Sequence, residues 1–139
     1  MFPTAGLYVM TTELVLLALS VVLGLLHIVL TSHAKSFQYG YRWSASARDQ
    51  PQPPLVGIAG RLERASSNFF ETFPLFATAV LIAHIAGRNG ALTAWGAQLY
   101  FWARVAYLPL YALGVVLIRS LVWNVAFLGI ALMLLSLVL

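Results

Sequence analysis

The sequence lacks cysteine and contains few charged residues. Of its 139 residues, 9% are Asp, Glu, Lys or Arg, and 61% are hydrophobic. Soluble domains carry about 25% charged residues, so this chain has too few to cover a surface that faces water. The absence of cysteine excludes disulfides, thiolate metal sites and a cysteine nucleophile. The composition therefore predicts a protein that crosses a membrane several times.

Metal-ligand clusters and internal repeats are also missing. His27 and His84 have no companions at metal-ligand spacing, so we expect packing or hydrogen-bonding roles for them and no metal site. The net charge of +4 gives no reason to expect a nucleic-acid partner, because the basic residues flank apolar stretches. The two halves of the chain show no inverted symmetry, which leaves little basis for a transporter.

Four apolar stretches are long enough to cross about 30 Å of hydrocarbon as helices. They cover approximately residues 10–31, 56–86, 92–116 and 119–139. The predicted fold is therefore all-α: one integral-membrane domain, 1–139, built as a four-transmembrane-helix bundle. Residues 31–55 form a polar connection in which the Pro-Gln-Pro-Pro turn at 51–54 ends the first helix. Pro74 and Pro109 lie inside helices, where we expect bends.

Basic residues lie mostly on one side of the predicted membrane. The segments around the first and third connections contain Lys35, Arg42, Arg48, Arg61, Arg64 and Arg119. The opposite side contains Arg88 alone, and Arg104 falls within a span. The positive-inside rule therefore predicts that both termini lie outside and that the long first connection is cytoplasmic.

Two predicted helices carry polar stripes within apolar surroundings. On the second helix, Arg64, Asn68 and Glu71 share with Arg61 an arc of roughly 80°. A carboxylate inside a membrane is costly, so Glu71 is expected to have a partner or a ligand. The third helix has its own stripe, in which Tyr100, Arg104, Tyr107 and Tyr111 recur at helical spacing.

The two stripes are expected to face each other, because helices joined by a short turn are antiparallel neighbours. Tyr107 and Tyr111 share an arc of about 60° with Arg104. Glu71 and Arg104 differ in depth by about 6 Å, which the long arginine side chain can cover. We therefore expect an ion pair between them. On this expectation, Glu71→Gln would leave a buried cation unpaired, at a cost on the order of 3–5 kcal/mol.

Two interpretations of the facing stripes are open. A buried Glu71–Arg104 pair could do no more than lock two helices together. That pair leaves Asn68 and Tyr107 unexplained, whereas a cavity for a small zwitterion would use cations for its carboxylates and Glu71 for its ammonium group. Arg119, at the start of the fourth helix, either anchors that helix at the membrane surface or contacts a ligand.

The polar residues of the two stripes belong to two longer motifs. The first motif is Arg64-Ala-x-x-Asn68-x-x-Glu71, followed by Phe73-Pro74-Leu75-Phe76. The second motif is Ala103-Arg104-x-x-Tyr107-x-x-x-Tyr111, followed by Arg119-Ser120. Both motifs resemble sequences of the MAPEG family (membrane-associated proteins in eicosanoid and glutathione metabolism). The resemblance covers nearly the whole chain, and the segment Tyr-Phe-Trp-Ala-Arg-Val-Ala is most similar to the bacterial branch.

This resemblance implies a homotrimer in a bacterial inner membrane, with a glutathione site between neighbouring subunits near the cytoplasmic side. It implies a glutathione-dependent transferase or peroxidase, whose lipophilic electrophile enters from the membrane lipids through a groove between subunits. The residues expected to bind glutathione are Lys35, Arg64, Asn68, Glu71, Arg104, Tyr107, Tyr111, Arg119 and Ser120. The expected catalytic residues are Arg119, which would stabilise the thiolate, and Tyr107, which would donate a hydrogen bond. Lys35 would come from the adjacent subunit.

Several positions depart from the family pattern. Ser66 and Ser67 replace larger polar or basic residues of the eicosanoid enzymes, and Thr72 stands where one of them has tyrosine. Lys35 follows Ala34 rather than a second arginine. These departures favour the alternative hypothesis of a non-catalytic membrane binding or scaffold protein, which would hold a lipid in the groove between subunits.

Overall fold

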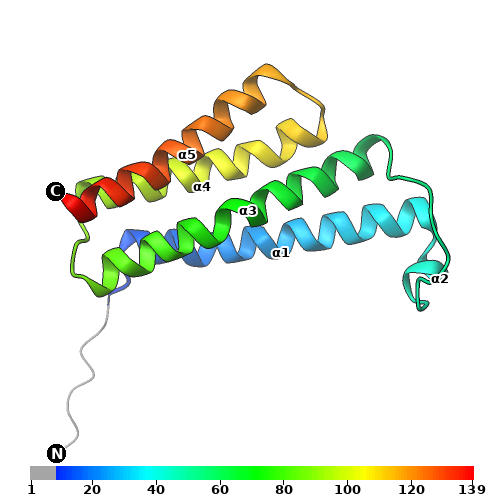
Figure 1. The fold of residues 1–139 in the computed structure, drawn as a ribbon, viewed down its shortest axis with the longest axis horizontal. Coiled ribbons are helices and arrows are strands. Elements are labelled where there is room, and N and C mark those ends of the chain that lie inside the picture. The colour runs from blue at the N-terminus through cyan, green and yellow to red at the C-terminus, as the bar shows by residue number, and fades with distance from the viewer. Residues whose placement is uncertain (1–8) are drawn as a thin grey trace, which may run out of the picture.

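Five helices make up the part of the chain that the computed structural model describes, residues 9–139. They are α1 (Thr12–Tyr39), α2 (Tyr41–Ser44), α3 (Gly57–Ile85), α4 (Ala91–Ala112) and α5 (Leu117–Val138). The four long helices run side by side, and the short α2 lies at one end of the bundle (Figure 1). Among these helices, α1, α3 and α5 are long and apolar enough to cross a membrane. The first eight residues of the predicted domain lie outside the described part.

The first helix is longer than the sequence predicts. It continues to Tyr39, whereas the expected end was near residue 31, and α2 occupies part of the predicted connection. No proline or glycine interrupts residues 32–39, so nothing in the backbone stops the helix before Gly40. Gly40 adopts φ +93°, and its N–H donates to Ser36 O at 2.8 Å. A glycine with positive φ therefore ends α1, well before the proline-rich turn.

Gly40→Ala is expected to lower the free energy of unfolding by about 1–3 kcal/mol, because side chains other than glycine rarely adopt this backbone conformation. A Cβ atom at Gly40 would meet no other atom within 4 Å. The cost would therefore arise from the backbone and not from a steric clash. Thermal unfolding of the purified protein in detergent measures the change. An unaltered melting temperature would mean that α1 does not end in this conformation.

The bundle core consists of apolar side chains between the two helix pairs α1–α3 and α4–α5. Phe76 of α3 stacks on Tyr100 of α4 with ring centroids 4.0 Å apart. Ser20 and Gly24 of α1 are both buried, and a Cβ atom at Gly24 would lie 3.1 Å from Phe69 Cε1 of α3. This small pair therefore lets α1 and α3 approach closely.

The connection between α4 and α5 begins earlier than predicted. Helix α4 ends at Ala112, not near residue 116, and α5 starts at Leu117. Gly114 lies in this turn with φ +77°. Arg61 of α3 donates through Nε to Ala112 O at 2.7 Å. This bond satisfies one of the carbonyl groups that the end of α4 leaves without a helical partner.

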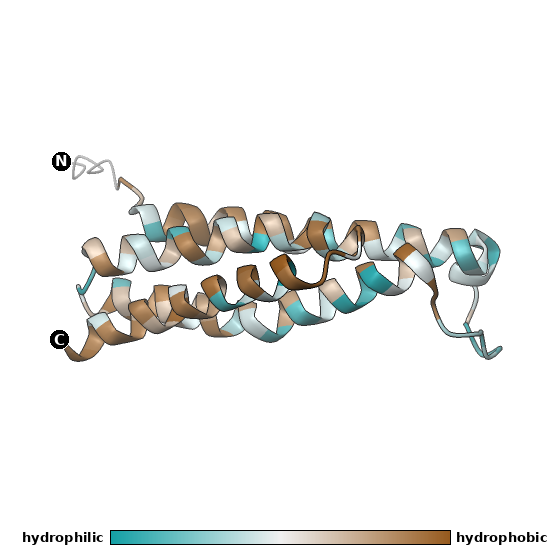
Figure 2. Ribbon diagram, turned by 90° about the horizontal axis from the view of Figure 1, so that it is seen from above, coloured by the Kyte–Doolittle hydropathy of each residue, from teal (hydrophilic) through white to brown (hydrophobic). Residues whose placement is uncertain are grey.

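The surface of the bundle is polar at one end and apolar along its length. Hydrophilic colours gather around α2, whereas α5 is hydrophobic over most of its length (Figure 2). Large apolar side chains such as Val22, Leu117 and Phe127 are exposed on the outside of the chain. A surface of this kind suits contact with hydrocarbon rather than with water.

Candidate functional site

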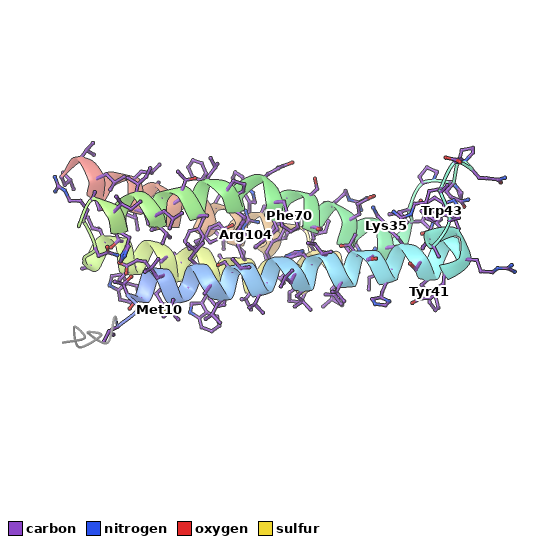
Figure 3. All side chains as sticks on the ribbon, turned by 90° about the horizontal axis from the view of Figure 1, so that it is seen from below. Met10, Lys35, Tyr41, Trp43, Phe70 and Arg104 are labelled. Carbon is purple, nitrogen blue, oxygen red and sulfur yellow. The ribbon has the colours of Figure 1, made fainter. Side chains whose placement is uncertain are left out.

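Arg104 of α4 lies in the middle of the bundle and is 1% exposed (Figure 3). Its Nη1 atom donates a hydrogen bond to Asn68 Oδ1 at 2.8 Å, and its Nη2 atom donates to Thr72 Oγ1 at 2.8 Å. Asn68 and Thr72 lie one turn apart on α3, so both acceptors face α4. Helix α3 therefore holds the buried guanidinium through two neutral oxygen atoms.

Two tyrosines complete the surroundings of Arg104. The guanidinium carbon lies 5.6 Å from the ring centroid of Tyr100 and 5.1 Å from that of Tyr107. The Tyr100 hydroxyl lies 3.1 Å from Thr72 Oγ1, so a hydrogen bond joins these side chains. The Arg104 Nε atom is buried without a hydrogen-bond partner among residues 9–139. The aromatic faces attract the cation but do not neutralise it, so the site has capacity to bind an anion.

The predicted ion pair between Glu71 and Arg104 is not formed. Within residues 9–139, the only salt bridge joins Lys35 Nζ to Glu63 Oε1 at 2.6 Å. Glu71 is exposed, and it lies about 60–100° around α3 from the two side chains that hold Arg104. Asn68 and Thr72 face α4 and bind Arg104. The Glu71 carboxylate lies on the exposed side of α3 instead.

Tyr111 of α4 lies between two further arginines. Arg64 of α3 donates through Nε to the Tyr111 hydroxyl at 3.3 Å. Arg119 of α5 places its guanidinium carbon 4.5 Å from the Tyr111 ring centroid. The rings of Tyr107 and Tyr111 are 5.5 Å apart. Neither arginine has a salt-bridge partner in the described part of the chain, so phenol groups and uncompensated positive charge gather here.

Two cavities share Trp123 of α5 as a lining residue. One has a volume of about 200 Å³ and is lined by Tyr107, Tyr111, Arg119, Ser120, Trp123 and Asn124. The other, of about 330 Å³, is a mostly apolar groove between α3 and α5 that reaches Thr72 and Arg104. The apolar groove and the polar cavity thus lie next to each other at Trp123, a combination that suits an amphiphilic ligand.

Lys35 lies apart from this cluster. Figure 3 shows it towards α2, whereas Arg104 is near the middle of the bundle. Its ammonium group pairs with Glu63 and lines a different cavity, between α1, α2 and α3. Ser120 does line the polar cavity, and its hydroxyl donates to Val116 O at 3.3 Å. One chain therefore gathers the predicted residues of α3, α4 and α5, except Glu71, and leaves Lys35 outside.

The hydrogen-bond network includes two residues to which sequence reasoning gave no role, Thr72 and Tyr100. Thr72 follows Asn68 by four positions, and Tyr100 precedes Arg104 by four. Residues at this spacing share a helix face, so the spacing was the signal that could have identified them.

His27 of α1 has a packing role. It is 1% exposed and stacks on Phe69 of α3 with ring centroids 4.7 Å apart. The described residues contain no group of three or more His, Cys, Asp or Glu side chains that could hold a metal ion.

The all-helical architecture, with three long apolar helices among the described residues, defines a multi-pass integral membrane protein. Its buried arginine and tyrosine cluster lies on the two motifs noted in the sequence. The sequence profile of the MAPEG family matches residues 16–139. The chain therefore belongs to the MAPEG family. No curated protein and no solved structure matches the chain significantly.

Proposed function

We propose that this protein is a glutathione-dependent transferase or peroxidase that acts on a lipophilic electrophile in the membrane. One observation carries the proposal: Arg64, Arg104 and Arg119 converge from three helices on the tyrosine pair of α4, without a carboxylate partner among the described residues. Uncompensated guanidinium groups beside a cavity select a ligand with carboxylates. Membership of the MAPEG family is consistent with this type of activity.

Glutathione fits the cluster by its charges, since it carries two carboxylates, one ammonium group and a thiol. We assign Arg64, Asn68 and Arg104 to the carboxylates, and the free Nε of Arg104 supports this assignment. Glu71 is assigned to the ammonium group, and the Tyr111 and Ser120 hydroxyls add hydrogen bonds. When bound, glutathione would supply the thiol whose ionised form is the nucleophile.

Arg119 and Tyr107 are the proposed catalytic residues. Both line the cavity of about 200 Å³, next to Trp123 and the apolar groove. The Arg119 guanidinium would stabilise negative charge on sulfur by proximity, and the Tyr107 hydroxyl would donate a hydrogen bond to the same atom. The groove between α3 and α5 would orient the hydrocarbon part of the second substrate and exclude water.

We further propose that α4 is a fourth membrane span. Its 22 residues correspond to about 33 Å of helix, enough to cross the hydrocarbon. Arg104, Tyr100 and Tyr107, which make its sequence less apolar, are buried among the other helices. Polar groups that face the interior of a bundle are compatible with a membrane span.

The exposed Glu71 supports assembly of several chains. It lies midway along α3, which is long and apolar enough to cross a membrane. A carboxylate exposed to lipid at that depth is costly, so we propose that a neighbouring subunit covers it. The family resemblance implies a homotrimer, in which the adjacent subunit's Lys35 would complete the site.

The distribution of charge supports one orientation in the membrane. Six of the basic residues lie at the α2 end of the bundle: Lys35, Arg42, Arg48, Arg61, Arg64 and Arg119. Arg88 alone lies at the other end. We propose that both termini lie outside, in a bacterial inner membrane, and that the site is near the cytoplasmic side.

The decisive measurement is the ultraviolet absorbance of thiolate when glutathione is added to the purified protein in detergent. The parent protein should give a saturable signal, and Arg119→Gln should reduce the bound thiolate by about tenfold, because a charge-assisted contact to sulfur is lost. The matched control Arg88→Gln removes the same charge at the opposite end and should leave the signal unchanged.

Two outcomes would contradict the proposal. The first is a parent protein that gives no thiolate signal and does not conjugate a generic aryl halide to glutathione. The second is an equal signal from Arg119→Gln and from the control, which would remove Arg119 from the site.

A second candidate function is the binding of a lipid without catalysis. The apolar groove of about 330 Å³ between α3 and α5 favours it. The Thr72 hydroxyl also favours it, because this hydroxyl is bonded to Arg104 and is not free to contact glutathione. Lipid that co-purifies with the protein, while the thiolate signal stays absent at saturating glutathione, would support this function over the first.

A further inference from the structure

A cavity of about 730 Å³ lies at the α2 end of the bundle. It is lined by residues from the end of α1, from α2, from part of the connection 45–56 and from the start of α3. Figure 3 shows two of its lining residues, Lys35 and Trp43, near α2 and away from Arg104. Of the residues proposed to bind glutathione, only Lys35 and Arg64 line it. Most of its lining therefore has no part in the proposed activity.

Hydrogen bonds fix the wall of this cavity. The Tyr39 hydroxyl donates to Pro53 O at 2.6 Å, which ties the proline-rich segment to the end of α1. The Ser36 hydroxyl donates to Ser44 Oγ at 2.8 Å, which ties α2 to the same helix. The cavity is thus a built feature and not a gap beneath a loose connection.

The lining carries excess positive charge. Three cations line the cavity, Lys35, Arg48 and Arg64, and one carboxylate, Glu63, gives a net charge of +2. Glu63 neutralises Lys35, because their charged atoms are 2.6 Å apart. The two arginines have no salt-bridge partner among the described residues. An anionic ligand would therefore be favoured in this cavity.

Arg48 is held at the cavity by an unusual backbone. Its φ of 60° is the only positive φ of a residue other than glycine in the described part of the chain, and such a conformation is rare. The guanidinium donates to Ser44 O through Nε at 3.1 Å and Nη2 at 3.0 Å, and its carbon lies 5.7 Å from the Trp43 ring. Within residues 9–139, Nη1 makes no hydrogen bond, so one charged donor remains free for a ligand.

Neutral donors and an apolar side complete the lining. The hydroxyls of Ser32 and Ser66 line the cavity and have no hydrogen bond to other described residues. Guanidinium groups together with hydroxyl donors suit phosphate, which offers several acceptor oxygens. Ile28 also lines the cavity and is 51% exposed on the outer face of α1. A hydrocarbon chain attached to the phosphate could therefore leave the cavity along that face.

We propose that this cavity binds the phosphate group of an anionic glycerophospholipid. The phosphate lies between Arg48 and the free serine hydroxyls, and the acyl chains pass Ile28 along α1. The surroundings suit a lipid headgroup, because the aromatic residues Tyr39 and Trp43 and most of the basic residues gather at this end of the bundle. Such residues are enriched where proteins meet anionic membrane surfaces.

The test is native mass spectrometry of the purified protein in a neutral detergent, titrated with phosphatidylglycerol or phosphatidylcholine. Phosphatidylglycerol should bind saturably and more tightly, because the cationic choline group is disfavoured beside excess positive charge. Arg48→Gln should weaken this binding by about tenfold, the effect of losing one charge-assisted contact. The matched control Arg42→Gln removes the same charge from α2, at a position that does not line the cavity, and should change binding by less than about twofold.

A second pair of variants separates binding from the shape of the connection. Ser66→Leu narrows the cavity from α3 and leaves the sequence of residues 45–56 unchanged, and it should also abolish the preference for phosphatidylglycerol. Ser67→Leu makes the same change at the next position, which does not line the cavity, and should bind lipid like the parent. Melting temperatures of all four variants identify any loss of lipid binding that comes from unfolding of the protein.

Three results would overturn the proposal. Equal weakening by Arg42→Gln and Arg48→Gln would show diffuse attraction to the basic surface. Equal affinity for the two lipids would exclude an anion site. Soluble glycerol phosphate that displaces the lipid at equal concentration would keep the phosphate chemistry but exclude a lipid as its source. The glutathione thiolate signal of Arg48→Gln should match the parent, so this proposal and the proposed activity can fail separately.

Discussion

Gly96→Val is expected to lower the free energy of unfolding by about 3 kcal/mol, because it forces α4 away from α5. A Cβ atom at Gly96 would lie 2.5 Å from Gly129 O and 2.6 Å from Met133 Cγ. The first of these atoms belongs to the backbone of α5, which cannot move aside as a flexible side chain can. Thermal unfolding in detergent measures the change, together with the yield of folded protein.

The control for this prediction is Ala91→Val, which places the same valine side chain at an exposed position of α4 and should melt within a few degrees of the parent. Gly129→Val tests the contact from the other helix, since a Cβ there would lie 2.5 Å from Gly96 O. The two glycine variants should not be additive, because either one alone separates the helices. A Gly96→Val protein that melts like the control would show that the two backbones do not touch.

This glycine contact shapes the candidate site at the other end of the same helix pair. Figure 1 shows α4 and α5 close together near the C-terminus and further apart towards the turn at 113–116. Tyr107, Tyr111 and Trp123 occupy the wider end and line the cavity of about 200 Å³ with Arg119. Small residues at one end and large residues at the other thus produce a wedge, and the polar cavity lies in its open part.

Hydrophobicity predicts the long helices well where a composition change marks their ends. Helix α3 begins and ends within one residue of the expected 56–86, because the proline-rich turn precedes it and a Gly-Arg-Asn-Gly turn follows. The predicted end of α1 is wrong, because a helix can continue through residues that are not hydrophobic. Residues 32–39 are more polar than the span before them, yet they continue the helix until Gly40.

Helical spacing predicts the two polar faces but not the partner of Arg104. The expected pairing with Glu71 follows from the attraction of opposite charges. The observed bonds to Asn68 and Thr72 depend instead on which side chains of α3 point at α4. Side chains one turn apart point at the same neighbour, and a carboxylate one position away points elsewhere. Lys35, which was expected to bind glutathione, instead pairs with Glu63 of α3 in the single chain.

Removing both acceptors of Arg104, by Asn68→Leu together with Thr72→Val, is expected to cost about 3–5 kcal/mol. The guanidinium is 1% exposed and keeps no hydrogen-bond partner once these oxygens are lost. The same change removes the partner of the Tyr100 hydroxyl. Thermal unfolding in detergent measures the loss, and each single substitution should cost about 1–3 kcal/mol.

Adding Arg104→Met to this double variant should recover much of the lost stability, because it removes the buried charge instead of leaving it unpaired. Glu71→Gln provides the contrast. Its carboxylate is exposed and makes no ion pair, so in detergent the single chain should lose less than about 0.5 kcal/mol, while the proposed binding of the glutathione ammonium group is lost. A Glu71→Gln protein that is strongly destabilised, beside a double variant that melts like the parent, would restore the ion pair and reject the network of Asn68, Thr72 and Arg104.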